Sequence, residues 1–228
     1  MYIPNKFPYI ELTRDETDGS RKYNTPDGER LASVTTILGA TKPQESIDAL
    51  ENWRKRVGYQ KAKEVTETAS SRGTRMHKYL ELFVINGELN IPGSNPYAKQ
   101  ANAMANEIVK HGLVNCSEYW GVEVNLYYPQ VYAGTTDLLG VHKGSPAILD
   151  FKQSNRVKKR EWIDDYFLQL TSYAQAHNAL YGTDIQKGVI MMCTPELEYQ
   201  EFVIEGDEFK HYSDLWWKRV EQYYTQLL

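Results

Sequence analysis

The chain has 228 residues, of which 41% are hydrophobic and 25% are charged, and this predicts one sizeable globular domain with a hydrophobic core. Aromatic residues, mostly tyrosine, make up 12% of the chain, which excludes a disordered protein. The net charge of -4 excludes a uniformly basic nucleic-acid-binding protein, but it leaves open local basic patches and acid-rich metal sites.

No apolar run is long enough to span a membrane, and the first residues resemble neither a signal peptide nor a transit peptide. We therefore expect a cytoplasmic protein without membrane partners. Cys116 and Cys193 lie far apart in the sequence and within predicted core segments. They are expected to be reduced packing residues.

The first 112 residues are predicted to begin extended and then become helical. Thr25 to Gly28 form a strong turn tetrapeptide within an extended segment, and Ser33 is a good cap for a short helix. Apolar residues spaced three and four apart, with proline or glycine near the ends, predict three further helices. They are 43–58, 60–85 and 97–111.

The second half of the chain is rich in β-forming residues. Five strands are predicted, at 119–128, 132–141, 147–153, 188–193 and 199–204. Amphipathic helices are predicted from Asp165 to Tyr181 and from Asp207 onward. Because no repeat or linker marks a boundary, we expect a single domain over residues 1–228. It would comprise an N-terminal hairpin and helical lobe (1–112) and an α/β core (113–228).

An acid and a base lie two positions apart in the apolar run that ends at Gln153. Asp150 and Lys152 share a face of this strand, because strand side chains alternate, and Asp137 lies on the preceding strand. Two converging carboxylates repel each other, and a divalent cation between them relieves the repulsion. Taken alone, Asp-x-Lys favours a salt-bridged surface hairpin, because that triplet is common.

Further motifs accompany this triplet. Gln169 and Tyr173 lie four apart on the next predicted helix, and Gly73 and His77 lie four apart on an earlier one. With Asp137, Asp150 and Lys152 they resemble the PD-(D/E)xK nuclease superfamily and its RecB-like branch. That branch has a Gln-x-x-x-Tyr motif after the triplet and a metal-binding histidine on an upstream helix.

The segment from Ser33 to Leu38 precedes a helix that contains Trp53. Together with Arg72-Gly73 and His77, it resembles the mitochondrial genome maintenance exonuclease family and its phage-encoded relatives. The resemblance covers residues 33–173. Gln153 departs from the threonine that this family usually carries, which affects hydrogen bonding next to Lys152. Some superfamily members use an acid at the position of Glu123, but we expect this glutamate to face water on an edge strand.

The resemblance implies an α/β fold with a restriction-endonuclease-like core, a central mixed β-sheet flanked by helices. It implies that Mg²⁺ or Mn²⁺ is held by His77, Asp137, Asp150 and the backbone carbonyl of Phe151. The implied catalytic residues are Asp137, Asp150, Lys152 and Gln169. Iron–sulfur members need four cysteine ligands, so the two cysteines exclude that cofactor.

Local basic clusters indicate where DNA would bind, although such clusters are usually solvated faces. The predicted nucleic-acid-binding residues are Arg72, Ser154, Arg156, Lys158, Lys159, Arg160 and Tyr173. The resemblance implies a DNA exonuclease that prefers single-stranded or frayed ends. Two alternatives are a structure-selective endonuclease with the same metal site and a non-catalytic DNA-binding module of this fold.

Overall fold

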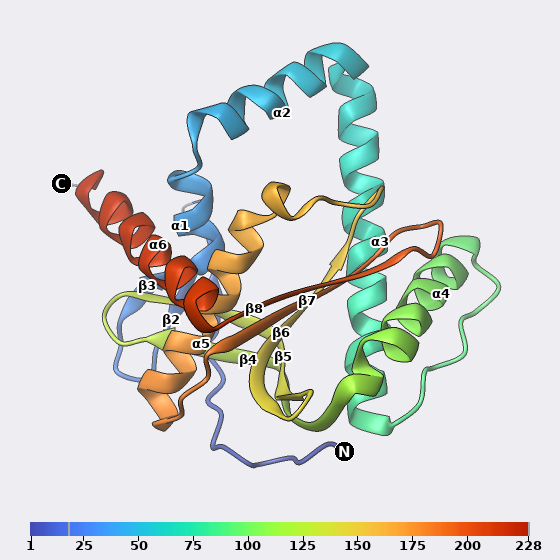
Figure 1. The fold of residues 1–228 in the computed structure, drawn as a ribbon. Helices are drawn as coiled ribbons and strands as arrows, with labels where there is room; N and C mark the ends of the chain where they lie inside the picture. The colour runs from blue at the N-terminus through green and yellow to red at the C-terminus, as the bar shows by residue number, and fades with distance from the viewer. Residues whose placement is uncertain (18, 228) are drawn as a thin grey trace.

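A five-stranded mixed sheet forms the centre of the computed structural model, which describes residues 1–17 and 19–227. In spatial order its strands are β4 (Cys116–Tyr128), β5 (Tyr132–His142), β6 (Ser145–Gln153), β7 (Lys187–Cys193) and β8 (Tyr199–Glu205). Only the β6–β7 pair in this sheet is parallel. All five predicted strands are confirmed, and so is the mixed sheet flanked by helices (Figure 1).

A crossover joins the two parallel strands. Parallel neighbours cannot be linked by a tight turn, and the chain between them forms the short helix η2 (Arg160–Trp162) and the helix α5 (Asp164–Tyr181). Both strands are central, so their apolar runs are buried on both faces; every residue of β7 is buried. Lys152 lies near the end of β6, just before this crossover begins, and Gln169 lies on α5.

Helices cover both faces of the sheet (Figure 1). On one face lie α1 (Val34–Ala40), α5 and α6 (Gly206–Thr225), whose apolar side chains join one core cluster. On the other face lie α3 (Tyr59–Asn86) and α4 (Pro96–His111), which form a second cluster with β6 and β7. The result is three layers, helix on sheet on helix.

The N-terminal segment forms a small antiparallel sheet of its own, made of β1 (Thr13–Asp15), β2 (Lys22–Asn24) and β3 (Arg30–Ala32). The predicted turn joins β2 to β3. Ser33 then caps α1 as predicted, because its hydroxyl accepts a hydrogen bond from the Thr36 amide at 2.9 Å.

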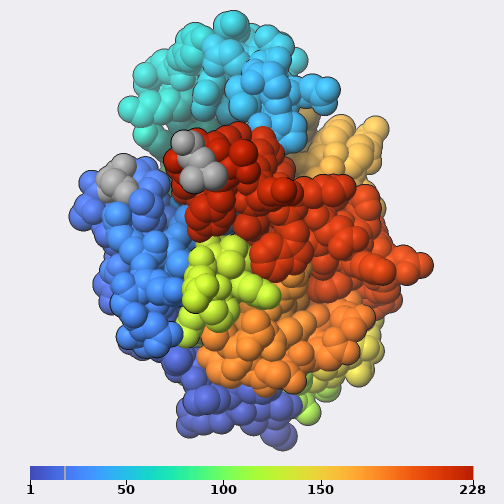
Figure 2. All heavy atoms as spheres, turned by 90° about the vertical axis from the view of Figure 1, so that its left-hand side faces the viewer, coloured from blue at the N-terminus to red at the C-terminus, as the bar shows by residue number. Residues whose placement is uncertain are grey.

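The helices within residues 1–112 have no core separate from that of the sheet. Residues 1–112 form no separate body, because α1 packs into one core cluster while α3 and α4 form a layer of the sandwich. Only α2 (Gln44–Val57) stands away from the sheet, and none of its residues is buried. Its apolar Ile47 and Leu50 are exposed. In Figure 2, α2 and the start of α3 project above α6.

Both cysteines are free, as predicted, with Cys193 buried and Cys116 half-buried. Among the described helices, none has the length and apolar character needed to cross a membrane.

His177 joins the N-terminal segment to α5. Its Nε2 lies 3.2 Å from the Tyr9 hydroxyl, its Nδ1 lies 2.8 Å from the Thr183 hydroxyl, and its ring packs edge-on against Phe7. The side chain is fully buried. Burial disfavours the charged imidazolium and lowers the pKa of His177 to about 4.

We expect this histidine to make the fold sensitive to acid. The unfolded chain takes up the proton at about pH 6.5, and the folded chain takes it up only near pH 4. The stability linked to His177 is therefore complete above pH 6.5 and is lost as the pH falls towards 4, with a loss of about 2 kcal/mol at pH 5. Urea unfolding at pH 7 and pH 5 should show a larger loss for the native chain than for His177→Gln. Equal losses would contradict this account.

Candidate metal and catalytic site

A cavity of about 670 Å³ lies between α3, the N-terminal sheet and the strands β5 and β6. Most of the predicted catalytic and metal-binding side chains line it. These are His77, Asp137, Asp150, Lys152 and Gln169. The fold thus gathers residues from α3, β5, β6 and α5 at one place.

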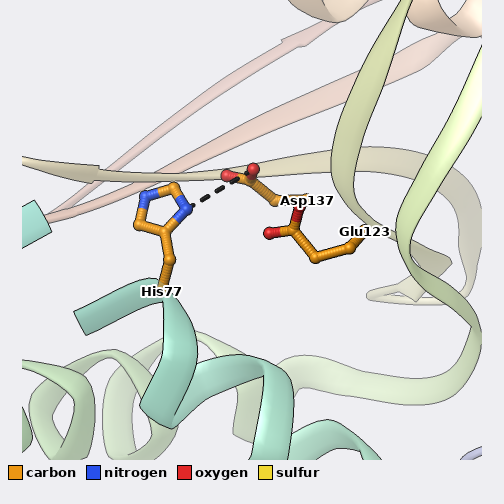
Figure 3. A group of neighbouring side chains, drawn as sticks. All are labelled: His77, Glu123 and Asp137. Atoms are coloured by element: carbon orange, nitrogen blue, oxygen red, sulfur yellow. Dashed lines mark ion pairs between the residues drawn. The ribbon is translucent and has the colours of Figure 1, made fainter. Parts of the chain in front are cut away.

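Within this cavity three potential ligands form a compact group. His77 from α3, Glu123 from β4 and Asp137 from β5 each offer a ligand atom, and these atoms lie within 4.8 Å of one another (Figure 3). The His77 Nδ1 lies 3.5 Å from an Asp137 carboxylate oxygen. An imidazole nitrogen with two carboxylates is a donor set that fits Mn²⁺ and also accommodates Mg²⁺.

Glu123 was expected to face water outside the site. The residue is exposed, as predicted, but its carboxylate belongs to the compact group. The strand register explains this, because Val122 lies opposite Leu138 and Val124 opposite Thr136, which brings Glu123 beside Asp137 on one face. Loss of hydration at its carboxylate within the cavity and repulsion from Asp137 raise the pKa of Glu123 to about 7.

Asp137 is contacted both by His77 and by the main chain of β6. Its Oδ2 accepts a hydrogen bond of 2.7 Å from the Phe151 amide. Burial opposes its ionisation, but the attraction of His77 and Lys152, together with that hydrogen bond, outweighs burial and lowers the pKa of Asp137. Burial likewise opposes the charged form of His77, but Asp137 prevails and raises the pKa of His77 to about 9. A metal bound there would take the place of the imidazole proton.

Asp150 and Lys152 form an ion pair at the end of β6. The Lys152 ammonium donates to Gln169 Oε1 at 3.2 Å, and the Gln169 amide donates to the Tyr173 hydroxyl at 3.3 Å. The two motifs predicted from spacing are therefore one hydrogen-bonded chain. Burial and repulsion from Asp137 raise the pKa of Asp150 to about 6, despite the opposing attraction of Lys152.

The compact group thus differs from the predicted ligand set. It contains His77 and Asp137, adds Glu123 and leaves out Asp150, whose carboxylate engages Lys152 in the same cavity. The backbone amide of Phe151, and not the predicted carbonyl, contacts Asp137. The Phe151 ring packs edge-on against the His77 ring, with centroids 6.0 Å apart.

The predicted nucleic-acid-binding residues are not all placed for that role. Ser154 is buried and donates to the Arg156 carbonyl, so we no longer expect it to contact DNA. Arg72 donates to the Gln153 side chain at 3.0 and 2.8 Å, which joins α3 to the end of β6. Tyr173 is buried too, although it lines the cavity.

The basic run after β6 lies outside the cavity lining. Arg160 is held by a salt bridge to Glu208 at 2.7 Å and donates to the Val203 carbonyl. Lys158 is half-buried, whereas Arg156 and Lys159 are exposed. The structure therefore leaves Arg156 and Lys159 as the accessible charges of this run.

Two arginines at the cavity were missed from the sequence. Arg14 and Arg21 line it from the N-terminal sheet, and both lie close to Glu16, at 3.4 and 3.0 Å. No spacing rule could have identified them, because they reach the cavity only after this small sheet packs beside β5.

Comparison with known proteins finds three sequence relatives that share the same name. Mitochondrial genome maintenance exonuclease 1 of Xenopus tropicalis is 26% identical over 240 residues, and its human counterpart is 24% identical over 238. Each alignment covers 96% of this chain. The mouse protein is 26% identical over 204 residues, 85% of this chain. The chain spans 66%, 67% and 59% of the frog, human and mouse proteins.

No family model matches the chain. Among solved structures, a protein of Eubacterium rectale named as a candidate exonuclease is 18% identical, with a TM-score of 0.48. The match covers 68% of this chain and 64% of that one. This likeness is too distant to support an argument. The three exonuclease-named relatives confirm that the chain resembles the mitochondrial genome maintenance exonucleases.

We expect Mn²⁺ to bind at the compact group. Asp137→Asn and Glu123→Gln should each weaken Mn²⁺ binding at least about tenfold in titration calorimetry, because each removes a charged ligand. Glu81→Gln is the matched control, since Glu81 lines the same cavity but pairs with Lys78 at 2.9 Å. If Glu123→Gln bound Mn²⁺ like the native chain while Asp150→Asn did not, the metal would belong to Asp150 instead.

Proposed function

We propose that the chain is a metal-dependent DNA exonuclease of the PD-(D/E)xK type, of its RecB-like branch, with phage-encoded proteins among its relatives. The observation that carries this proposal is that Asp137, Asp150 and Lys152 line one cavity, with Gln169 bound to Lys152. A surface salt-bridged hairpin would have no reason to bury these charges, because an uncompensated buried carboxylate is costly. The exonuclease names of the sequence relatives support the same activity.

Each residue has a part in phosphodiester hydrolysis. A divalent ion held at the site would lower the pKa of a bound water and stabilise charge on the phosphate. His77, Glu123 and Asp137 would bind this ion, and Asp150 would complete its environment on the side of Lys152. The Lys152 ammonium would orient the attacking water or neutralise the phosphate. Gln169, supported by Tyr173, holds that ammonium in place.

Basic side chains at the cavity and on α2 indicate how a DNA strand would approach the site. Acidic groups concentrate at the site itself, whereas Arg14, Arg21 and Lys78 also line the cavity. Such cations would bind phosphates without reading sequence. The helix α2 stands off the sheet and carries basic residues in its last turn. We expect these charges to guide a single strand towards the site.

Activity tests distinguish this proposal from its alternatives. End-labelled linear single strands should be degraded in Mg²⁺ or Mn²⁺, and Asp150→Asn should reduce the rate at least about 100-fold while the variant stays folded. Covalently closed single-stranded circles should resist. Cutting of circles at the rate of linear strands would favour the endonuclease, and binding without any cleavage would favour the non-catalytic module.

The accessible basic residues make a second test. Neutralising Arg156 and Lys159 together to glutamine should weaken single-strand binding and lower the slope of log affinity against log salt. Each lost phosphate contact is expected to lower it by roughly 0.7. The control is Lys99→Gln with Lys110→Gln, which removes the same charge from exposed positions of α4. Equal effects of the two pairs would show that net charge, and not this location, matters.

A further inference from the structure

We infer that Trp162 is a stacking platform for an unpaired base of single-stranded DNA, with Arg156 and Lys159 binding the phosphates on either side of that base. The inference rests on the proposed function and extends it to a second contact, outside the catalytic cavity.

The exposure of Trp162 is unusual for this chain. Of the five tryptophans, all within the described residues, Trp120 and Trp216 are buried and Trp53 and Trp217 are partly buried. Trp162 is 52% exposed. An exposed indole does not gain the free energy that burial of its apolar surface would give. Its exposed face is, however, free to stack against a planar partner.

The tryptophan lies on the element that leads into the site. It ends η2, directly before α5, and Gln169 follows seven residues later, about 10 Å along a helix axis. Between them, the Tyr166 ring lies 4.9 Å from the Lys152 ammonium. A strand with a phosphate at Lys152 therefore needs to extend only a short way along α5 to bring a base to Trp162.

Two exposed cations lie near the indole. The Arg156 guanidinium and the Lys159 ammonium lie 5.8 and 5.5 Å from the ring centroid, at the outer limit of a cation–π contact. Both side chains are exposed, and the only ion pair of Lys159 among the described residues is a long one, 3.9 Å, to Glu161. These charges can turn to phosphates at little cost, because they give up weak contacts.

The neighbouring cavity indicates which part of a nucleotide fits there. Trp162 lines a space of about 620 Å³ between the start of α2 and α6. Its charged lining is balanced, with the bases Lys42, Lys218 and Arg219 and the acids Glu161, Asp164 and Asp165. A space without net positive charge does not favour a phosphate or an anionic lipid surface, but it accepts a neutral base beside the indole.

Stacking on an aromatic face is tolerant of sequence, since every base has a π-face. An exonuclease that moves along a strand needs contacts of this kind, which are equivalent for each successive nucleotide. Trp162 would hold the strand in line without selecting a base.

The test combines a protein change with a missing base. Binding of fluorescent single strands is measured in the Asp150→Asn background, which prevents cleavage, with an abasic site placed at each position in turn. One abasic position should weaken binding to the Trp162-containing chain by about fivefold or more, the low end of the effect of removing one stacked aromatic. The same abasic site should have no effect on Trp162→Ala, and Trp162→Phe should restore most of the dependence.

Tyr97→Ala is the control, because Tyr97 is a comparably exposed aromatic side chain (61%) on α4. It should retain the full abasic effect. If Trp162→Ala binds intact strands like its parent, or loses affinity equally for intact and abasic strands, the stacking role is wrong while the proposed nuclease stands. If the parent chain binds no single strand at all, both are wrong.

Discussion

The electrostatic cost of holding Asp137 and Asp150 in one buried cavity is the constraint on which the rest of the site depends. Two carboxylates out of water repel each other, and each also loses hydration. The chain meets this cost with a separate partner for each acid. His77 and the Phe151 amide stabilise Asp137, and Lys152 stabilises Asp150. The pKa of Asp137 is lowered as a result, whereas that of Asp150 stays raised because burial and repulsion from Asp137 outweigh the attraction of Lys152.

The crossover from β6 through α5 to β7 makes these partners rigid. Since the two strands are parallel and buried on both faces, Asp150 and Lys152 cannot shift without moving the centre of the sheet. The helix α5 packs over the same strands and places Gln169 against Lys152. The lysine that we propose as catalytic is thus fixed by the most buried part of the fold, whereas the residues expected to touch the strand lie on exposed elements.

The sequence predicted those parts of the structure that follow from local chemistry. β-rich runs located the five strands, and Ser33 marked the start of a helix. The spacing of Asp150 and Lys152 predicted a shared strand face, and the resemblance to a nuclease family added Gln169. The place of Glu123 depends on the register of β4, which sequence alone does not give, because this strand has a register shift between Tyr119 and Gly121 and a positive φ of 51° at Glu123 itself. Tertiary packing alone decides that α3 and α4 become a layer while α2 does not.

Arg219 makes a contact with α1 that joins distant parts of the chain. From α6 it donates to the Leu38 carbonyl at the end of α1 and pairs with Asp165 at the start of α5. The contact with Leu38 spans 181 positions of the chain. Contacts of such sequence separation carry a large loop-closure entropy and form slowly. During synthesis this contact cannot form until α6 has emerged, so the Leu38 end of α1 lacks its anchor until then.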